Sequence, residues 1–214
     1  MKSYRYLQSL ESYVIKQLNN FFPTSNKIKK NQVKKEIKFS FERSVYCFEK
    51  IKTKYFNNNK SLHLNSEKYS IFLYFLSNEL YKAKKIEIAE KAYYLNKILN
   101  GIDIFYEVEM PDIFYLIHPV GTVLGKAKYK NFFVAYQNCT VGANKNIFPN
   151  IEEYVTMRPG SKIIGNCRIN SNCDIGLNAV VLDKNIKSNS IYLGDPNNFK
   201  IIPNKKKNIW FKFN

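Results

Sequence analysis

An unbroken six-residue period in the C-terminal half is the feature that most constrains how this chain of 214 residues can fold. Apolar residues occupy every sixth position of one stretch, and these are Ile151, Met157, Ile163, Ile169, Ile175 and Val181. Four positions after each of the first five stands a small or medium-sized residue: Val155, Ser161, Cys167, Cys173 and Ala179. A strand of a sandwich or barrel would alternate with a period of two instead, so this half indicates a repeat architecture.

The six-residue period is typical of a coil built from short strands and turns. Each repeat supplies one strand and one turn, and three repeats close one triangular coil of about eighteen residues. A single coil cannot bury its apolar side chains, so successive coils must stack. The segments VLGKAK and TVGANK fit the same period more loosely and extend it toward the N-terminus. We therefore expect a parallel β-helix over residues 101–202.

The residues before this region carry apolar side chains at helical spacing instead. One helix should end before Pro23, because proline disfavours helix at the residue that precedes it. A second helix is predicted over Val33 to Phe48, and a third from Ser66, whose hydroxyl can cap the free amides of the first turn. Apolar residues at Ile88, Ala92, Leu95 and Leu99 extend this helical pattern to Gly101.

The predicted fold class is α+β, an N-terminal helical domain followed by the β-helix. We place a helical assembly domain at 1–100, the β-helix domain at 101–202 and a basic tail at 203–214. No apolar run approaches the roughly 18 residues of a membrane span, and the N-terminus lacks the features of a signal peptide. The four cysteines show no CxxC spacing, which favours reduced core thiols. These features predict a cytoplasmic protein without a membrane span.

The formal net charge of +17 is compatible with nucleic acid or other anionic partners. The lysines are dispersed, however, and no nucleic-acid-binding motif accompanies them. We therefore expect a solvated, lysine-rich surface and no nucleic-acid partner, with nucleic-acid binding as the lesser alternative.

Four segments of the C-terminal half resemble the hexapeptide acyltransferases, and within them the serine acetyltransferase type. They are HPVGTVLGKAKY from His118, VAYQNCTVGANKNIFPNI, GSKIIGNCRINSNCDIGLNAVVL and SIYLGDP. The resemblance is closer to the proteins of surface-polysaccharide biosynthesis than to the enzyme of cysteine biosynthesis. It implies a left-handed β-helix, acetyl-CoA as co-substrate, no metal, and a homotrimer, with a dimer of trimers as the larger alternative.

The resemblance assigns the catalytic chemistry to His118 and Asp103. In that family a histidine at the position of His118 acts as general base, and an aspartate one coil earlier orients it. Asp103 precedes His118 by fifteen residues, a separation that can place the two side chains on adjacent rungs. A carboxylate bonded to one ring nitrogen leaves the other free to take the proton of a hydroxyl, which then attacks the thioester of acyl-CoA.

The resemblance also implies a CoA groove between the coils of two subunits. By this resemblance, backbone groups would hold CoA, and the residues that line the groove would be Gly142, Ala143, Pro159, Gly160, Leu177, Asn178 and Ala179. Lys200, or the run Lys205–Lys207, would meet the 3′-phosphate of CoA as point charges.

Three positions depart from the serine acetyltransferase pattern. The family has an aspartate where this chain has Ile117, and an arginine and a histidine where it has Ile147 and Phe148. An apolar pocket cannot pair the ammonium and carboxylate groups of serine, and burying them unpaired is costly. We therefore expect O-acetylation of a sugar or polysaccharide precursor, whose hydroxyl approaches over Phe148 and Tyr136.

Three alternatives stay open. A sugar N-acyltransferase needs the same base, so only its amide product would distinguish it. A serine O-acetyltransferase would mean that the three substitutions do not exclude the amino acid. An inactive β-helix scaffold would have no reason to bind acetyl-CoA.

Overall fold

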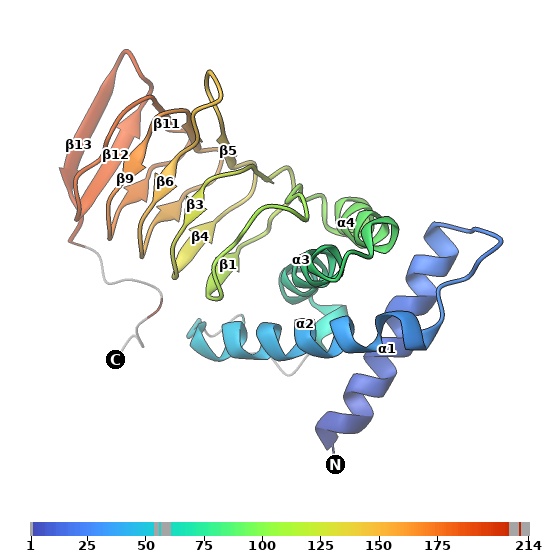
Figure 1. The fold of residues 1–214 in the computed structure, drawn as a ribbon. Helices are drawn as coiled ribbons and strands as arrows, with labels where there is room; N and C mark the ends of the chain where they lie inside the picture. Colours follow the sequence, from blue (N-terminus) through green and yellow to red (C-terminus); the bar gives the residue numbers. More distant parts are fainter. Residues whose placement is uncertain (1, 54–55, 57–60, 206–209, 211–214) are drawn as a thin grey trace.

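The computed structural model describes residues 2–53, 56, 61–205 and 210. A helical part and a β-solenoid follow each other along the molecule (Figure 1). The described helices are α1 (Lys2–Phe21), α2 (Lys30–Lys50), the short 3₁₀ helix η1 (Leu62–Leu64), α3 (Ser66–Lys82) and α4 (Ile86–Asn100). The helical pattern predicted up to Gly101 is therefore confirmed, and its last part is divided into α3 and α4. Among the described residues, no helix combines the length and the apolar character that a bilayer crossing requires.

The two ends of the α3–α4 pair show how local sequence sets helix boundaries. Gly101 ends α4 in the left-handed conformation with φ of 62°, which glycine adopts without a steric penalty. At the start of α3, the side chain of Asn65 accepts a hydrogen bond from the amide of Lys68 at 3.0 Å. The prediction that Ser66 is the cap is wrong, because Ser66 is already helical while Asn65 has the extended backbone that a cap needs.

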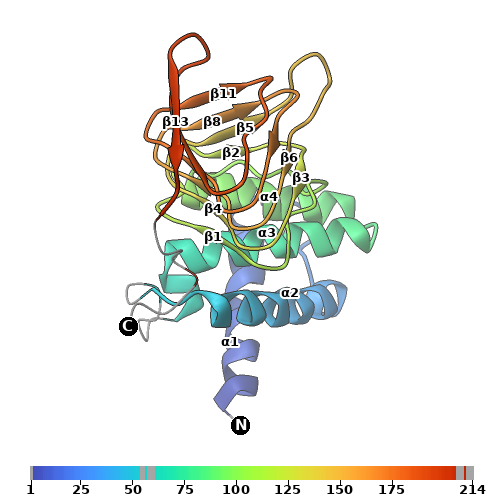
Figure 2. The same cartoon turned by 90° about the vertical axis from the view of Figure 1, so that its left-hand side faces the viewer.

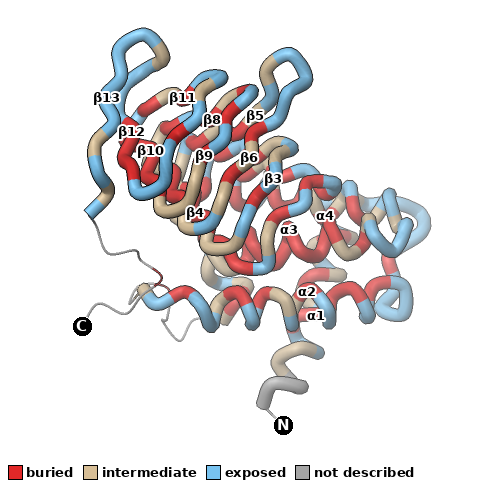
Figure 3. Tube along the Cα trace, turned by 60° about the vertical axis from the view of Figure 1, so that its left-hand side comes forward, coloured by how far each residue is buried: buried red, intermediate tan, exposed pale blue. Residues whose placement is uncertain are grey.

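Helix α3 is the link between the two parts of the molecule. It packs against α2, α4 and strand β1 (Phe114–Leu116), and its Ile71, Tyr74 and Phe75 belong to the same buried cluster as the solenoid interior. The hydroxyl of Tyr74 donates to the carbonyl of Val108 at 2.7 Å and accepts from the amide of Met110 at 2.9 Å. The first coil is thus fixed to the helices by polar and apolar contacts. The buried band along α3 that continues into the strands is visible in Figure 3.

The solenoid is a parallel coil whose strands recur on three sheets. Its strands are β1 (Phe114–Leu116), β2 (Val123–Leu124), β3 (Lys128–Tyr129), β4 (Phe133–Ala135), β5 (Thr140–Gly142), β6 (Asn150–Ile151), β7 (Thr156–Met157), β8 (Lys162–Ile164), β9 (Arg168–Ile169), β10 (Asp174–Ile175), β11 (Val180–Leu182), β12 (Ser190–Gly194) and β13 (Phe199–Pro203). The sheets run β1-β4-β7-β10-β12-β13, β2-β5-β8-β11 and β3-β6-β9. Figure 2 shows the coils stacked behind one another. The predicted fold class is confirmed.

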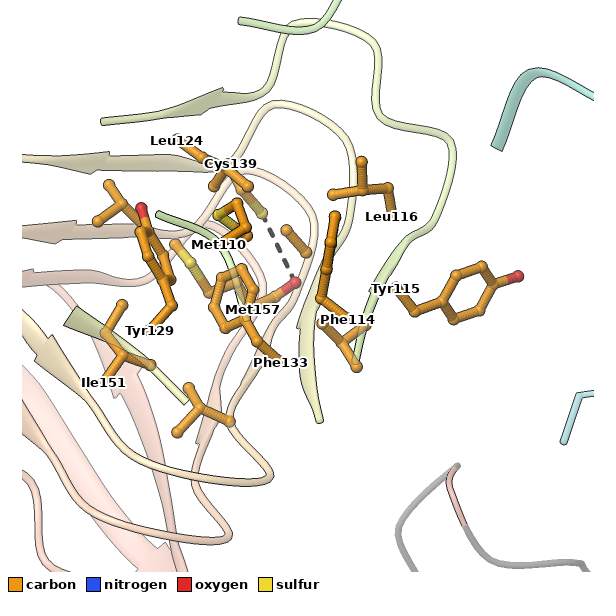
Figure 4. Packing of buried hydrophobic residues seen from close by; sticks show 14 of the residues in the cluster. Met110, Phe114, Tyr115, Leu116, Leu124, Tyr129, Phe133, Cys139, Ile151 and Met157 are labelled. Carbon is orange, nitrogen blue, oxygen red and sulfur yellow. Dashed lines mark hydrogen bonds between the residues drawn. The ribbon is translucent and has the colours of Figure 1, made fainter. Parts of the chain in front are cut away.

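The six-residue period maps directly onto the interior of this coil. Met157 pairs with Ile175, eighteen residues later, as one full coil requires. All six apolar residues of the period and all five small residues between them are buried. Figure 4 shows part of this interior, where the thiol of Cys139 lies 3.6 Å from the carbonyl oxygen of Met157. Side chains of matched size therefore stack from coil to coil.

The predicted buried thiols are confirmed, since all four cysteines are free and buried. Burial is the largest influence on each, and it raises the pKa of Cys47 to about 12. A thiol that stays protonated is a poor nucleophile. The cysteines therefore contribute packing to the core.

The C-terminal end of the solenoid is closed by a change of direction. Strand β13 pairs with β12 in antiparallel fashion, so the parallel stack ends there. Beyond it, Trp210 is buried and its ring lies 5.4 Å from that of Phe132. Of the predicted basic run, Lys206 and Lys207 lie outside the described residues. The predicted domain boundaries stay predictions, because one buried cluster joins α3 to the solenoid.

Candidate active site

His118 lies in the turn between the six-stranded and the four-stranded sheet. Strand β1 ends two residues before it, and β2 begins five residues after it. Its φ is 49°. The turn that holds it is two residues longer than the matching turn of the next coil, because Leu116 pairs with Ala135 and Val123 pairs with Thr140. The left-handed backbone at His118 therefore belongs to this longer first turn. The imidazole is 77 % exposed, so an external molecule can reach it.

Glu67 is the carboxylate that faces His118. Its Oε1 lies 3.5 Å from Nδ1 of the imidazole and accepts a hydrogen bond from the backbone amide of His118 at 3.3 Å. Its Oε2 accepts a hydrogen bond from the hydroxyl of Tyr115 at 2.8 Å. Burial, with the nearby Glu67, raises the pKa of Tyr115, so this phenol stays protonated and keeps donating. Glu67 belongs to the first turn of α3, and its side chain is only 14 % exposed.

Asp103 has other partners than the predicted one. The hydroxyl of Tyr93 donates to Oδ1 and the ammonium of Lys97 donates to Oδ2, each at 2.7 Å. The hydrogen bond that Lys97 donates to Asp103 is the main reason that the pKa of Lys97 is raised. Both carboxylate oxygens are thus directed at helix α4. The prediction that Asp103 pairs with His118 is therefore wrong for the described chain, in which Asp103 pairs with Tyr93 and Lys97.

The reason for this correction is the register of the first coil. Residue Asp103 forms a bridge with Val123, which lies five residues beyond His118. Its backbone amide donates to Thr122 and its carbonyl accepts from Leu124, so the residue is fixed beside the next strand. Asp103 and His118 are fifteen residues apart in the sequence. That separation does not say on which face of the coil the Asp103 carboxylate lies.

The edge that carries His118 also carries a column of side chains from later coils. Ile117, Tyr136 and Arg158 follow the equivalent strands β1, β4 and β7. The guanidinium of Arg158 lies over the ring of Tyr136, 5.6 Å from its centroid, and its Nε donates to Oδ2 of Asp174 at 3.0 Å. Of the predicted substrate residues, Ile117 and Tyr136 therefore share the edge with His118. The Arg158–Asp174 pair was missed, although its sixteen-residue separation is close to one coil.

Some of the predicted CoA residues lie on this same edge. Pro159 and Gly160 stand in the turn before β8, and Leu177 and Asn178 stand in the turn before β11. Leu177 is 67 % exposed and available to a ligand. Ala179 is wholly buried, so its side chain cannot line a groove.

The remaining predicted residues lie elsewhere on the chain. Gly142 is the last residue of β5. Ala143, Ile147 and Phe148 belong to the loop that leads from there to the three-stranded sheet, and this loop stands out beside β5 in Figure 1. Ile147 and Phe148 are exposed there, and the ammonium of Lys126 lies 5.2 Å from the centroid of Phe148.

Lys200 is exposed on β13, at the opposite end of the six-stranded sheet from β1. The residues predicted for substrate and CoA are therefore divided between separate parts of the single chain. Within the described ranges, no group of three or more His, Cys, Asp or Glu residues is placed to hold a metal ion.

In both sequence and fold, the known proteins that this chain is similar to are serine acetyltransferases. No protein-family profile matches the chain. The serine acetyltransferase of Staphylococcus xylosus is 29 % identical over 133 residues, which cover 60 % of this chain and 61 % of that protein. The chain thus spans about three fifths of the length of this relative.

Two solved structures share the fold. A serine acetyltransferase in complex with cysteine has a TM-score of 0.76 and 18 % identity, and the match covers 92 % of this chain and 81 % of that one. A serine acetyltransferase in complex with CoA has a TM-score of 0.66 and 16 % identity, with 81 % and 75 % covered. At these identities the likeness concerns the fold: four N-terminal helices followed by a parallel β-solenoid of about four turns.

Proposed function

We propose that the chain is an acyl-CoA-dependent O-acetyltransferase with His118 as its general base. The observation that carries this proposal is an exposed imidazole on a coil turn, backed by a carboxylate, in a fold shared with serine acetyltransferases. A carboxylate near Nδ1 favours a proton on that nitrogen and leaves Nε2 free to accept another. This is the arrangement that a general base for a hydroxyl group requires.

The reaction moves one acetyl group and one proton. Nε2 of His118 takes the proton of the acceptor hydroxyl as its oxygen attacks the thioester carbonyl. The C–S bond then breaks, and the thiolate of CoA leaves and takes up the proton. An alcohol is a weak nucleophile at neutral pH, and a positioned base contributes typically about 10²–10⁴-fold to such a step.

Acetyl-CoA is the co-substrate in this proposal. A solved relative of the same fold holds CoA, and the exposed edge beside His118 offers backbone groups around Pro159, Gly160 and Leu177. Gly142 and Ala143 lie on a different edge of the chain, so a groove that includes them needs a second subunit. This division supports a trimer, in which one edge of each protomer meets another edge of its neighbour.

The acceptor is the finer part of the proposal. The relatives in sequence and in structure are serine acetyltransferases, so L-serine is the first acceptor to test and is better supported than the sugar predicted from sequence. A sugar hydroxyl is the second candidate. It is favoured by the apolar Ile117 near His118, by the exposed ring of Phe148 and by the partly buried ring of Tyr136, since none of these side chains pairs an ammonium or a carboxylate.

The test is the release of free thiol from acetyl-CoA with L-serine and with a panel of nucleotide sugars and oligosaccharides. We expect acceptor-dependent thiol release that falls by at least a hundredfold in His118→Ala. His63→Ala is the matched control, because it removes the other histidine of the chain and leaves the coil turn intact. Equal rates in His118→Ala and the wild type would refute the role of His118. No binding of acetyl-CoA by titration calorimetry would favour the inactive scaffold.

A further inference from the structure

Glu67 is held by its own domain in a position that serves His118. It is the second residue of α3, where the free amides of the first turn favour a negative charge. Asn65 caps this turn, so the helix start that carries Glu67 has a defined geometry. The carboxylate thus projects from a fixed helix end toward the solenoid.

Both oxygens of Glu67 are engaged by the first coil. Tyr115, which is almost fully buried on β1, holds Oε2 through its hydroxyl. Oε1 then faces the amide and the imidazole of the same residue, His118. The Tyr115 hydroxyl on Oε2 and the His118 amide on Oε1 together fix the plane of the carboxylate. The imidazole of His118 is the third group beside this carboxylate.

No other carboxylate of the described chain lies within 4.0 Å of the imidazole. Asp103 is directed at Tyr93 and Lys97 on α4. The 3.5 Å separation between Oε1 and Nδ1 is longer than a hydrogen bond, and catalytic contacts of this kind commonly tighten when substrate binds. The imidazole is exposed and can turn by the small angle that this requires.

We propose that Glu67 is the positioning residue for His118, in the place that sequence had given to Asp103. The inference rests on the proposed function, because it names the group that orients the proposed base. It follows that the helical part, which was predicted to serve assembly, also contributes a side chain to the site. One of its side chains selects the imidazole tautomer with the proton on Nδ1, so the docking of α3 on the first coil is a condition for turnover.

The test compares Glu67→Met, Glu67→Gln and the wild type by two measurements. Methionine keeps the length of the side chain and removes both acceptors, while glutamine keeps one acceptor and removes the charge. We expect kcat to fall about 10- to 100-fold in Glu67→Met, less in Glu67→Gln, with little change in KM for acetyl-CoA. Glu87→Met is the matched control, because Glu87 is likewise the second residue of a helix and is exposed.

The second measurement is the tautomer of His118, read from ¹⁵N spectra of the imidazoles and assigned with His118→Ala. The chain has two histidines, so the assignment is direct. We expect the Nδ1–H form to lose population in Glu67→Met and to persist in Glu87→Met and Asp103→Asn. An unchanged tautomer and kcat in Glu67→Met would overturn the proposal, as would a shift seen in Asp103→Asn alone. If the wild type releases no thiol with any acceptor, the proposed function fails while the tautomer still tests the contact.

Discussion

Removing one hydroxyl at the junction of helices and solenoid should show how firmly α3 fixes the first coil. Tyr74 is fully buried, and its hydroxyl makes two hydrogen bonds to the backbone, with Val108 at 2.7 Å and Met110 at 2.9 Å. Tyr74→Phe keeps the ring and its packing against Phe114. The change therefore isolates the two polar contacts.

The expected magnitude follows from these bonds. A buried backbone group that loses its partner costs roughly 1–3 kcal/mol, and two such groups are affected here. We expect the free energy of unfolding to fall by about 2–4 kcal/mol after partial relaxation. For a chain of this length this corresponds to a decrease in Tm of roughly 5–15 °C.

The assay is thermal and denaturant unfolding followed by circular dichroism at one fixed protein concentration, since assembly would make Tm concentration-dependent. Tyr46→Phe is the matched control, because the Tyr46 ring is 48 % exposed and its loss of a hydroxyl should cost almost nothing. Equal midpoints for the two variants would show that the junction does not depend on the Tyr74 bonds. The account of α3 as the link between the parts would then be refuted.

Three further predictions concern a turn, a cap and the assembly. Gly160 has φ of 73°, and an added Cβ would collide with the side-chain oxygen of Asn178, so Gly160→Ala should lower the free energy of unfolding by about 1–2 kcal/mol or more. Adding Asn178→Ala to Gly160→Ala should restore part of this free energy. If the double variant restores none of it, the clash does not explain the loss. Asn65→Ala should lower the free energy of unfolding, measured in urea, by about 1 kcal/mol because the α3 cap is lost, and Ser66→Ala should lower it less. A larger loss in Ser66→Ala would show that Ser66 is the cap. Light scattering should give a trimer, and a monodisperse monomer would contradict the shared groove.

The comparison of α3 in sequence and structure shows how far local signals reach. The spacing of apolar residues predicted the helix, because one face must be buried. The choice between Ser66 and Asn65 as cap depended on which residue keeps an extended backbone, and both residue types are good caps. Packing of the whole helix decided this, and the sequence did not.

The site divides in the same way. The turns with Pro159 and Leu177 follow from the repeat, because each coil returns to the same edge. The turn that holds His118 has two more residues than the matching turn of the next coil, which the period does not predict. The partner of the imidazole did not follow. Glu67 stands 51 residues earlier, on another part of the molecule, and no periodicity relates a helix start to a coil turn. Asp103 had the residue type and spacing expected of this partner. Its carboxylate is instead hydrogen-bonded to Tyr93 and Lys97 of α4.

By itself the sequence determined the stacked coil, since six apolar residues at a fixed period of six can be buried together only when the coils stack. Only the tertiary structure decided which carboxylate faces the imidazole and which residues share an edge. These outcomes depend on how the helices dock against the first coil and on side-chain directions, and neither is encoded in the spacing of residues along one chain.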